Sequence, residues 1–335
     1  MQKIRWAVVG TSDFALNWIA PGIQMGRNAT LAAIVSRDPN RAADAAQRLA
    51  APQHFTSIEE IDRGQVDGVF IVTPNTQHAP LAIAAAQRGL HVVVEKPMAP
   101  TVQECQAMIV AAHEHGVMLA VAHCMEWAPP LAKARQLLQD GAIGIPISAS
   151  FKMSFNAPNA GAWRQNEPSE AGGGPLFDVG VHSIDALQQL LGPVVRVAAF
   201  MDHHIHHYTA EDTTTLLLRF ASGVHGSVQA HFNCDQNSFE IQGSDGYMWS
   251  NHWLGRNFSG ELFLQKGKRT SSFNLPACNV YVPQIEHVSE AIIKGTRPVI
   301  SGERGMSNIQ VIEAAIKSAR TGSIISKTST EQGAW

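Results

Sequence analysis

The residues Val92-Val93-Val94-Glu95-Lys96-Pro97 join an apolar, β-branched run to an acid, a cation and a proline. The valines favour a buried strand. Pro97 cannot donate to a sheet ladder and disfavours a helix at Lys96, so the strand should end here. Both charged side chains would then lie at the carboxyl end of a buried strand, which is where ligands bind in open α/β sheets. A surface Lys-Pro turn is the alternative, and the flanking sequence has to decide between the two.

Length and charge restrict the class of protein. A chain of 335 residues can form two domains, each with its own core. The net charge of -3, with scattered lysines and arginines, provides no basic surface for nucleic acid or for an anionic membrane. No apolar run approaches the roughly 20 residues of a membrane span, and the four cysteines form no C-x-x-C pair. We therefore expect a cytoplasmic protein with reduced thiols that binds neither nucleic acid nor membrane.

The order of strands and helices changes near His123. Before it, apolar strands are expected over 4–9, 31–35, 66–72, 91–94 and 117–122, separated by helices over 41–49, 79–88 and 102–114. This alternation predicts a doubly wound, parallel Rossmann domain over residues 1–123. Consecutive strands after His123 predict an α+β domain over residues 124–335, built on a mostly antiparallel open sheet. We expect this second domain to bind substrate and to form a homodimer or homotetramer through the open face of its sheet.

A dinucleotide-binding turn follows the first strand. Gly10-Thr11-Ser12-Asp13-Phe14-Ala15 matches G-x-G-x-x-G, with Ser12 and Ala15 in place of the second and third glycines. Gly10 permits the tight turn and Ala15 is small enough for close helix packing, whereas Ser12 must tolerate the approach of a pyrophosphate. The pattern predicts cofactor contacts at Gly10, Thr11, Ser12, Phe14 and Ala15.

The end of the second strand bears on the choice of nicotinamide cofactor. An NAD-specific site places a carboxylate there for the ribose hydroxyls, but this chain has Ser36, followed by Arg37 and Arg41. Either guanidinium can pair with a 2′-phosphate. In a different register, Asp38 would reach the ribose and reverse the preference. The sequence therefore favours NADP(H), with NAD(H) as the alternative.

A second group of reactive side chains lies in the glycine-rich segment over 172–185. Asp178 and His182 are four residues apart and share one face of a helix. A carboxylate one turn from an imidazole can orient it and favour its cationic form, which suits proton transfer near neutral pH. A purely structural pair is the alternative. No metal site is expected, because this pair has no third ligand and alternate histidines at His203, His204, His206 and His207 would point to opposite faces of a strand.

Together these segments resemble the Gfo/Idh/MocA family, named for glucose-fructose oxidoreductase, inositol dehydrogenase and a rhizopine-catabolism protein. The resemblance covers nearly the whole chain and is carried by Gly10, Thr73-Pro74-Asn75-x-x-His78, Glu95-Lys96-Pro97, the D-x-G-x-H segment and Gln242-Gly243-Ser244-Asp245-Gly246. Within the family, the G-x-S-x-x-A turn and the Trp163-Arg164 pair are similar to those of the 1,5-anhydro-D-fructose reductase subgroup.

The resemblance implies an NAD(P)-dependent oxidoreductase that moves a hydride between nicotinamide and a hydroxyl or carbonyl carbon of a sugar, polyol or related cyclic substrate. It implies Lys96, Asp178 and His182 as catalytic residues. His182 would act as acid or base, and Lys96 would polarise the substrate oxygen. The expected cofactor contacts also include Ser36, Arg37, Arg41, Thr73, Pro74, Asn75, His78, Glu95 and Lys96.

Substrate contacts are expected from the aromatic ring of Trp163, the guanidinium of Arg164 and the imidazole of His123. A loop packed against the domain boundary is the alternative for Trp163 and Arg164. Glu126-Trp127 stands where many relatives have a basic residue or a tyrosine, so the sugar specificity stays open. Two other functions fit the same fold: a non-catalytic sensor that binds dinucleotide and sugar, and a trans-dihydrodiol dehydrogenase.

Overall fold

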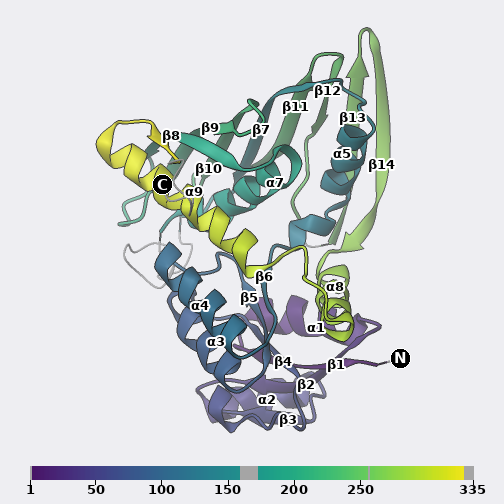
Figure 1. Ribbon diagram of the computed structural model, residues 1–335, viewed down its shortest axis with the longest axis vertical. Helices are drawn as coiled ribbons and strands as arrows, with labels where there is room; N and C mark the ends of the chain where they lie inside the picture. The colour runs from purple at the N-terminus through teal and green to yellow at the C-terminus, as the bar shows by residue number, and fades with distance from the viewer. Residues whose placement is uncertain (1, 159–172, 256, 328–335) are drawn as a thin grey trace. The chain divides into compact units, whose positions relative to one another are not determined.

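The structure, a computed structural model, describes residues 2–158, 173–255 and 257–327. The chain divides into two compact units (Figure 1). Unit 1 comprises Met1–Cys124 and Asn279–Met306, and unit 2 comprises Met125–Cys278 and Ser307–Trp335. The first break lies next to the expected boundary at residue 123. The segment Asn279–Met306 was expected in the second domain but belongs to unit 1.

Unit 1 contains a six-stranded parallel sheet with strand order β3-β2-β1-β4-β5-β6. Its strands are β1 (Ile4–Val9), β2 (Ala29–Val35), β3 (Gln53–Phe55), β4 (Gly68–Ile71), β5 (His91–Glu95) and β6 (Leu119–Ala122). The order reverses between β1 and β4, and in open α/β sheets ligands bind at the carboxyl ends of the strands at such a point. The predicted Rossmann fold is confirmed. The short β3 was not predicted, since its three residues are half-buried or exposed and form no apolar run.

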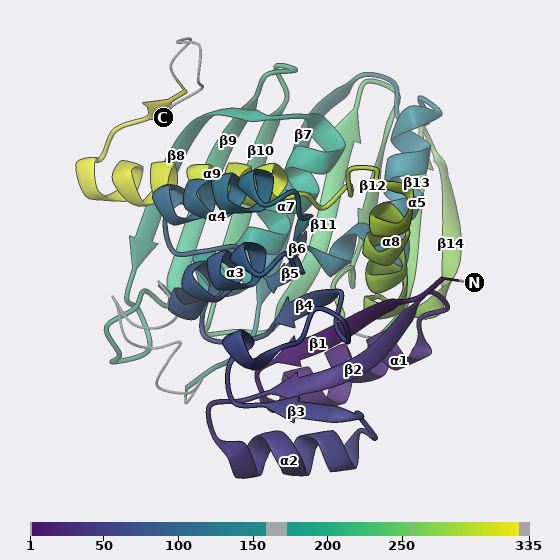
Figure 2. The ribbon, with the colours of Figure 1, turned by 60° about the horizontal axis from the view of Figure 1, so that its bottom comes forward.

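The helices of unit 1 are α1 (Ala20–Met25), α2 (Pro39–Arg48), α3 (His78–Gln87), α4 (Val102–Glu114) and α8 (Tyr281–Lys294). Figure 2 shows α2 beside β3 at one edge of the sheet. The α4 helix begins with a capping box, in which Thr101 and Glu104 satisfy each other's backbone N–H groups. Residues 102–114 were the predicted limits of this helix, and the structure confirms them.

The α8 helix, far away in the sequence, completes the core of unit 1 and lies beside α1 in Figure 1. The ring of Tyr281 packs edge-on against Phe14, with ring centroids 5.6 Å apart. The indole of Trp6, which is 0% exposed, donates to the hydroxyl of Ser289 over 3.0 Å. Because Trp6 lies in the middle of β1, this hydrogen bond ties α8 to the sheet that carries the dinucleotide turn.

Unit 2 contains a nine-stranded sheet with strand order β14-β13-β12-β11-β7-β10-β9-β8-β15. Its strands are β7 (Pro146–Ser154), β8 (Val194–Asp202), β9 (Thr213–Phe220), β10 (His225–His231), β11 (Gln236–Gly243), β12 (Gly246–Ser250), β13 (Asn257–Lys266), β14 (Arg269–Asn279) and β15 (Ile325–Ser326). Strand β7 pairs in parallel with β10 and antiparallel with β11. The predicted α+β domain on a mostly antiparallel sheet is confirmed.

The two faces of this sheet differ in how exposed their apolar side chains are. One is apolar and buried, with the stacked rings of Phe151 and Phe239 (centroids 4.9 Å apart) and Trp253 edge-on to Phe151. On the other face of the sheet, Phe200 is 74% and Leu217 is 60% exposed.

The helices of unit 2 are α5 (Pro129–Gln139), α7 (Val181–Leu191) and α9 (Gly302–Thr321), the last of which begins in unit 1. None of the helices in the described ranges is long and apolar enough to cross a membrane.

Candidate active site

The predicted cofactor residues of unit 1 follow the carboxyl ends of four parallel strands: β1, β2, β4 and β5. At the first of these, Gly10 has a φ of 118° and donates its N–H to the carbonyl of Val35 over 2.9 Å. A Cβ at this position would lie 2.3 Å from the carbonyl oxygen of Val72. Glycine is therefore required here, because the turn passes directly over the end of β4.

The helix after this turn begins with a π-helical segment, Ala15–Ile19. The hydroxyl of Ser12 accepts a hydrogen bond from the backbone N–H of Ala15 over 3.2 Å, so it caps the start of the helix. Its own hydroxyl hydrogen can still donate to an anion. Ala15 is 0% exposed, in keeping with the close helix packing that its size predicted. The turn thus has the small residues and the helix N-terminus that suit a pyrophosphate.

The polar residues Ser36, Asp38 and Arg41 after β2 each have a partner in unit 1. Asp38 is the N-cap of α2, and its Oδ1 accepts from the backbone N–H groups of Asn40 (2.9 Å) and Arg41 (3.2 Å). Ser36 comes first after the strand and accepts a hydrogen bond from the hydroxyl of Thr11 over 3.4 Å. The guanidinium of Arg41 donates to the carbonyl of Thr11 over 3.1 Å. A hydroxyl and an exposed cation therefore lie next to the dinucleotide turn, while the carboxylate is engaged by the helix.

The loops after β4 and β5 are linked by His78. Thr73-Pro74 leads into the short helical turn Asn75–Gln77, and His78 then begins α3. The imidazole Nδ1 lies 3.0 Å from the carbonyl oxygen of Pro97, and Nε2 lies 3.0 Å from that of Thr73. Lys96 follows the last residue of β5, as predicted, and its backbone N–H donates to the buried carboxylate of Glu95 over 3.2 Å.

Burial and charge alter the ionisation of groups near Lys96. The pKa of His78 is lowered to about 4, mainly by burial and in part by the positive charge of Lys96, although the backbone contacts act to raise it. Burial also raises the pKa of the Cys124 thiol to about 12, and the charge of Glu95 contributes to that increase. At neutral pH the imidazole is therefore neutral and the thiol protonated, so Cys124 is no nucleophile. His123, one residue earlier, is 1% exposed.

In unit 2, Asp178 lies in a π-helical turn, Leu176–Gly180, which continues into α7 and to the buried His182. The glycines before this turn allow a close backbone approach. A Cβ on Gly174 would lie 2.2 Å from the carbonyl oxygen of Glu211, whose carboxylate accepts from the N–H of Gly174 over 3.2 Å. Single π-helical turns occur often at functional sites, and this one carries Asp178, with His182 in the helix that follows.

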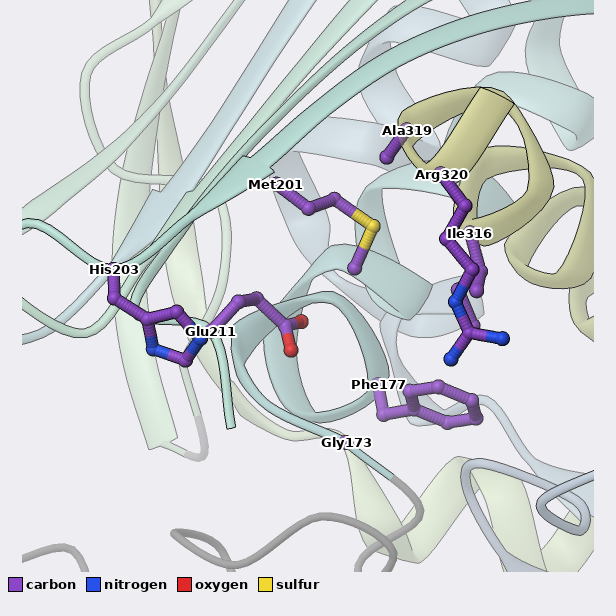
Figure 3. A pocket seen from close by; sticks show the side chains of 8 residues that line it. All are labelled: Gly173, Phe177, Met201, His203, Glu211, Ile316, Ala319 and Arg320. Carbon is purple, nitrogen blue, oxygen red and sulfur yellow. The ribbon is translucent and has the colours of Figure 1, made fainter. Parts of the chain in front are cut away.

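A cavity of about 180 Å³ lies beside this turn, within unit 2. Figure 3 shows the side chain of Arg320, from α9, directed toward the ring of Phe177, with Met201 and Glu211 reaching toward the same space. The cavity is lined by Gly173, Phe177, Met201, His203, Glu211, Ile316, Ala319 and Arg320. The volume is below the roughly 300–1,000 Å³ of common ligand pockets. We therefore assign the cavity to the packing around the glycine-rich turn.

Other polar residues of unit 2 have structural partners. The side chain of Asn308 on α9 donates to Asp185 on α7 over 2.9 Å. Glu126, buried, forms an ion pair with Arg135 and accepts from the side chain of Gln189, so these contacts join the short helical segment Cys124–Trp127 to α5 and α7. The described ranges contain no group of three or more His, Cys, Asp or Glu side chains placed to hold a metal. Trp163 and Arg164 lie outside the described residues.

The structure thus brings together several predicted residues within each unit. In unit 1, contacts join Thr11 to Ser36 and Arg41, and His78 joins the loops of Thr73 and Lys96. In unit 2, the turn and the helix that follows it carry the predicted acid and imidazole. Lys96 belongs to unit 1, whereas Asp178 and His182 belong to unit 2.

Comparison with known proteins identifies the family. The sequence model described as "Oxidoreductase family, NAD-binding Rossmann fold" matches residues 4–123, and the "GFO/IDH/MocA C-terminal domain" matches residues 131–249. The 1,5-anhydro-D-fructose reductase of Ensifer adhaerens is 30% identical over 324 residues, which are 95% of this chain and 97% of that protein. The chain belongs to the Gfo/Idh/MocA family. It is therefore an oxidoreductase with an NAD(P)-binding Rossmann unit.

Two further relatives of this Gfo/Idh/MocA protein cover almost its whole length. A D-xylose 1-dehydrogenase (NADP(+)) of Haloferax volcanii is 27% identical over 332 residues, covering 96% of this chain and 98% of that protein. The crystal structure of aldose-aldose oxidoreductase from Caulobacter crescentus, complexed with glycerol, has a TM-score of 0.91 and 28% sequence identity, and covers 97% of this chain and 100% of that one. The similarity therefore extends over both units.

The sequence analysis of this Gfo/Idh/MocA protein did not single out two acids, Glu211 and Asp212. They follow the histidines of residues 203–207. Both are buried, at 7% and 0% exposure. Two adjacent acids immediately before an apolar strand were the available signal. Asp38 followed by Pro39 is a common start of a helix, in keeping with its capping role in the structure.

Proposed function

We propose that the protein is an NADP(H)-dependent oxidoreductase that interconverts a hydroxyl and a carbonyl on a sugar, polyol or related cyclic substrate. Two relatives support the substrate class, since one is named a reductase of 1,5-anhydro-D-fructose and the other a dehydrogenase of D-xylose. The observation that carries the cofactor preference is the N-cap role of Asp38, which directs its carboxylate to the backbone of α2.

The residues at the strand ends fit a phosphorylated dinucleotide. Ser36 offers a hydroxyl where an NAD-specific site has a carboxylate, and Arg41 is an exposed cation whose guanidinium already contacts the dinucleotide turn. A guanidinium matches a 2′-phosphate in charge and geometry. The residues that would hold the cofactor are Gly10, Thr11, Ser12, Phe14, Ala15, Ser36, Arg37, Arg41, Thr73, Pro74, Asn75, Glu95 and Lys96.

Lys96, Asp178 and His182 act on the same substrate in this proposal. The nicotinamide, when bound, supplies or accepts the hydride. His182 takes the hydroxyl proton during oxidation and returns a proton to the oxygen during reduction. The ammonium of Lys96 donates a hydrogen bond to that oxygen, which stabilises negative charge developing there. Asp178 orients the imidazole or a substrate hydroxyl, and His123, Trp163 and Arg164 contact the rest of the substrate.

We also infer that the protein forms a homodimer or a dimer of dimers through the open face of the unit 2 sheet. Phe200 on β8 and Leu217 on β9 are exposed on neighbouring antiparallel strands. On β12 and β13, the half-exposed rings of Tyr247, Trp249 and Phe263 stack with centroids 5.0 and 5.1 Å apart. Large exposed apolar patches on soluble proteins mark interaction sites.

A substrate screen tests the proposal. The purified protein would be mixed with each nicotinamide cofactor and a panel of aldoses, ketoses, polyols and aryl dihydrodiols, and turnover followed by nicotinamide absorbance. Lys96→Ala is the matched control for background oxidation. We expect turnover on a sugar or polyol. Saturable cofactor binding without turnover on any compound would instead indicate a sensor, and activity confined to aryl dihydrodiols would reject the substrate class.

A further inference from the structure

His78 is a fully buried histidine whose two ring nitrogens both face backbone carbonyl oxygens. Its side chain is 0% exposed, and both contacts, to Pro97 and to Thr73, measure 3.0 Å. These two carbonyls belong to the loops after β5 and β4, which are neighbouring strands of the parallel sheet. One imidazole therefore lies between two loops at the carboxyl edge of the parallel sheet.

This geometry occupies both polar atoms of the ring. A neutral imidazole has one N–H and one lone pair, so it donates to one carbonyl and presents a lone pair to the other. Burial keeps the pKa of His78 near about 4, so the neutral form is present at pH 7. Two of the three backbone groups that act on the ring, those of Pro97 and Met98, come from the loop after β5. With the proton on Nδ1 the ring donates to the carbonyl of Pro97, and with the proton on Nε2 it donates to that of Thr73.

We propose that His78 is a positioning residue for Lys96, holding the Glu95-Lys96-Pro97 loop through the carbonyl of Pro97, instead of contacting the cofactor. The inference rests on the proposed catalytic role of Lys96. Pro97 is the next residue in the chain, so a hydrogen bond to its carbonyl restrains the backbone that carries the ammonium. Within a catalytic site, a shift of about 1 Å can cost about a hundredfold in rate.

Three variants separate this role from simple stability. His78→Leu removes both polar contacts, whereas His78→Asn keeps an amide nitrogen near the position of Nδ1. His91→Leu is the matched control, because His91 lies at the other end of β5 and its Nδ1 accepts from the N–H of Met118 over 3.0 Å. We expect kcat to fall about ten- to a hundredfold in His78→Leu with KM less affected. His78→Asn should recover most of that loss, and His91→Leu should turn over like the parent.

Parent-like turnover in His78→Leu, or an equal loss in His91→Leu, would overturn the assignment. Absence of turnover in the parent on every sugar and polyol would instead reject the proposed function. A measurement without cofactor or substrate keeps the two apart: nitrogen-resolved NMR of the ring of His78. We expect a slowly exchanging proton on Nδ1 in the parent. A rapidly exchanging ring proton, or one on Nε2, would contradict the proposed hydrogen bond to Pro97.

Discussion

Asp212 stabilises the loop after β8, and its loss should weaken unit 2 in a pH-dependent way. Its Oδ2 accepts from the backbone N–H groups of Ile205 (2.7 Å) and His206 (2.8 Å). Its Oδ1 accepts from the N–H of His204 (2.9 Å) and the hydroxyl of Thr213 (2.8 Å). Burial would raise the pKa of this carboxyl, but these hydrogen bonds lower it from 3.8 to about 2.

The sign of the effect follows from the lowered pKa. The charged carboxylate stabilises the folded state fully above the unfolded pKa of 3.8, and this contribution disappears as the pH falls toward about 2. The difference between the unfolded and folded pKa values corresponds to about 2 kcal/mol in the free energy of unfolding. Asp212→Asn removes the charge and also turns an amide donor toward backbone N–H groups. We therefore expect a loss of about 2–4 kcal/mol in the free energy of unfolding at pH 7.

The assay is urea denaturation of the parent and Asp212→Asn at several pH values from neutral to about pH 2.5, the acid range set by this linkage. Because pH 2.5 is still above the folded pKa of about 2, the difference in unfolding free energy between the two proteins should shrink by about 1.5 kcal/mol over the acid part of that range. Asp202→Asn is the control, because Asp202 is the exposed last residue of β8, where the same connection begins. A difference that does not change with pH, or an equal loss in Asp202→Asn, would refute the reasoning.

Two further outcomes are expected. Lys96→Ala and His182→Ala should each lower kcat about a hundredfold or more while changing the dissociation constant of the cofactor much less, because both act on the substrate oxygen; near-normal turnover would remove that residue from the mechanism. Leu217→Lys should shift the mass in light scattering from a dimer or tetramer toward a monomer, because it places a charge on the exposed sheet face. A monomeric parent at micromolar concentration would count against the assembly.

The parallel half of the fold was readable from the sequence because its signals are local. Each strand of unit 1 longer than three residues is an apolar run, and the helices between them have recognisable ends, such as Thr101 and Glu104 at α4. Lys96 could be placed at a strand end for the same reason. The role of Asp38 stayed open because the register of a strand end depends on how the next helix begins.

Long-range packing was the part that the sequence could not provide. Tyr281, Ile285 and Val288 give α8 an apolar face, but the pattern does not say which surface that face covers. The structure shows it against α1, β1 and β2 of unit 1. The parallel pairing of β7 with β10 is equally non-local, because it joins strands separated by a helix and two further strands. The bridge made by His78 depends on two loops that only the folded sheet brings together.

The cofactor preference is the most direct test of NADP(H)-dependent catalysis. Catalytic efficiency would be measured with NADPH and with NADH in the parent, in Arg41→Ala and in Arg48→Ala, a control on the same helix. The account predicts that the parent prefers NADPH. It also predicts that Arg41→Ala loses about ten- to a hundredfold with NADPH alone, the value of one charged hydrogen bond, and that Arg48→Ala behaves like the parent. A parent that prefers NADH, or a loss in Arg41→Ala that is equal for both cofactors, would contradict it.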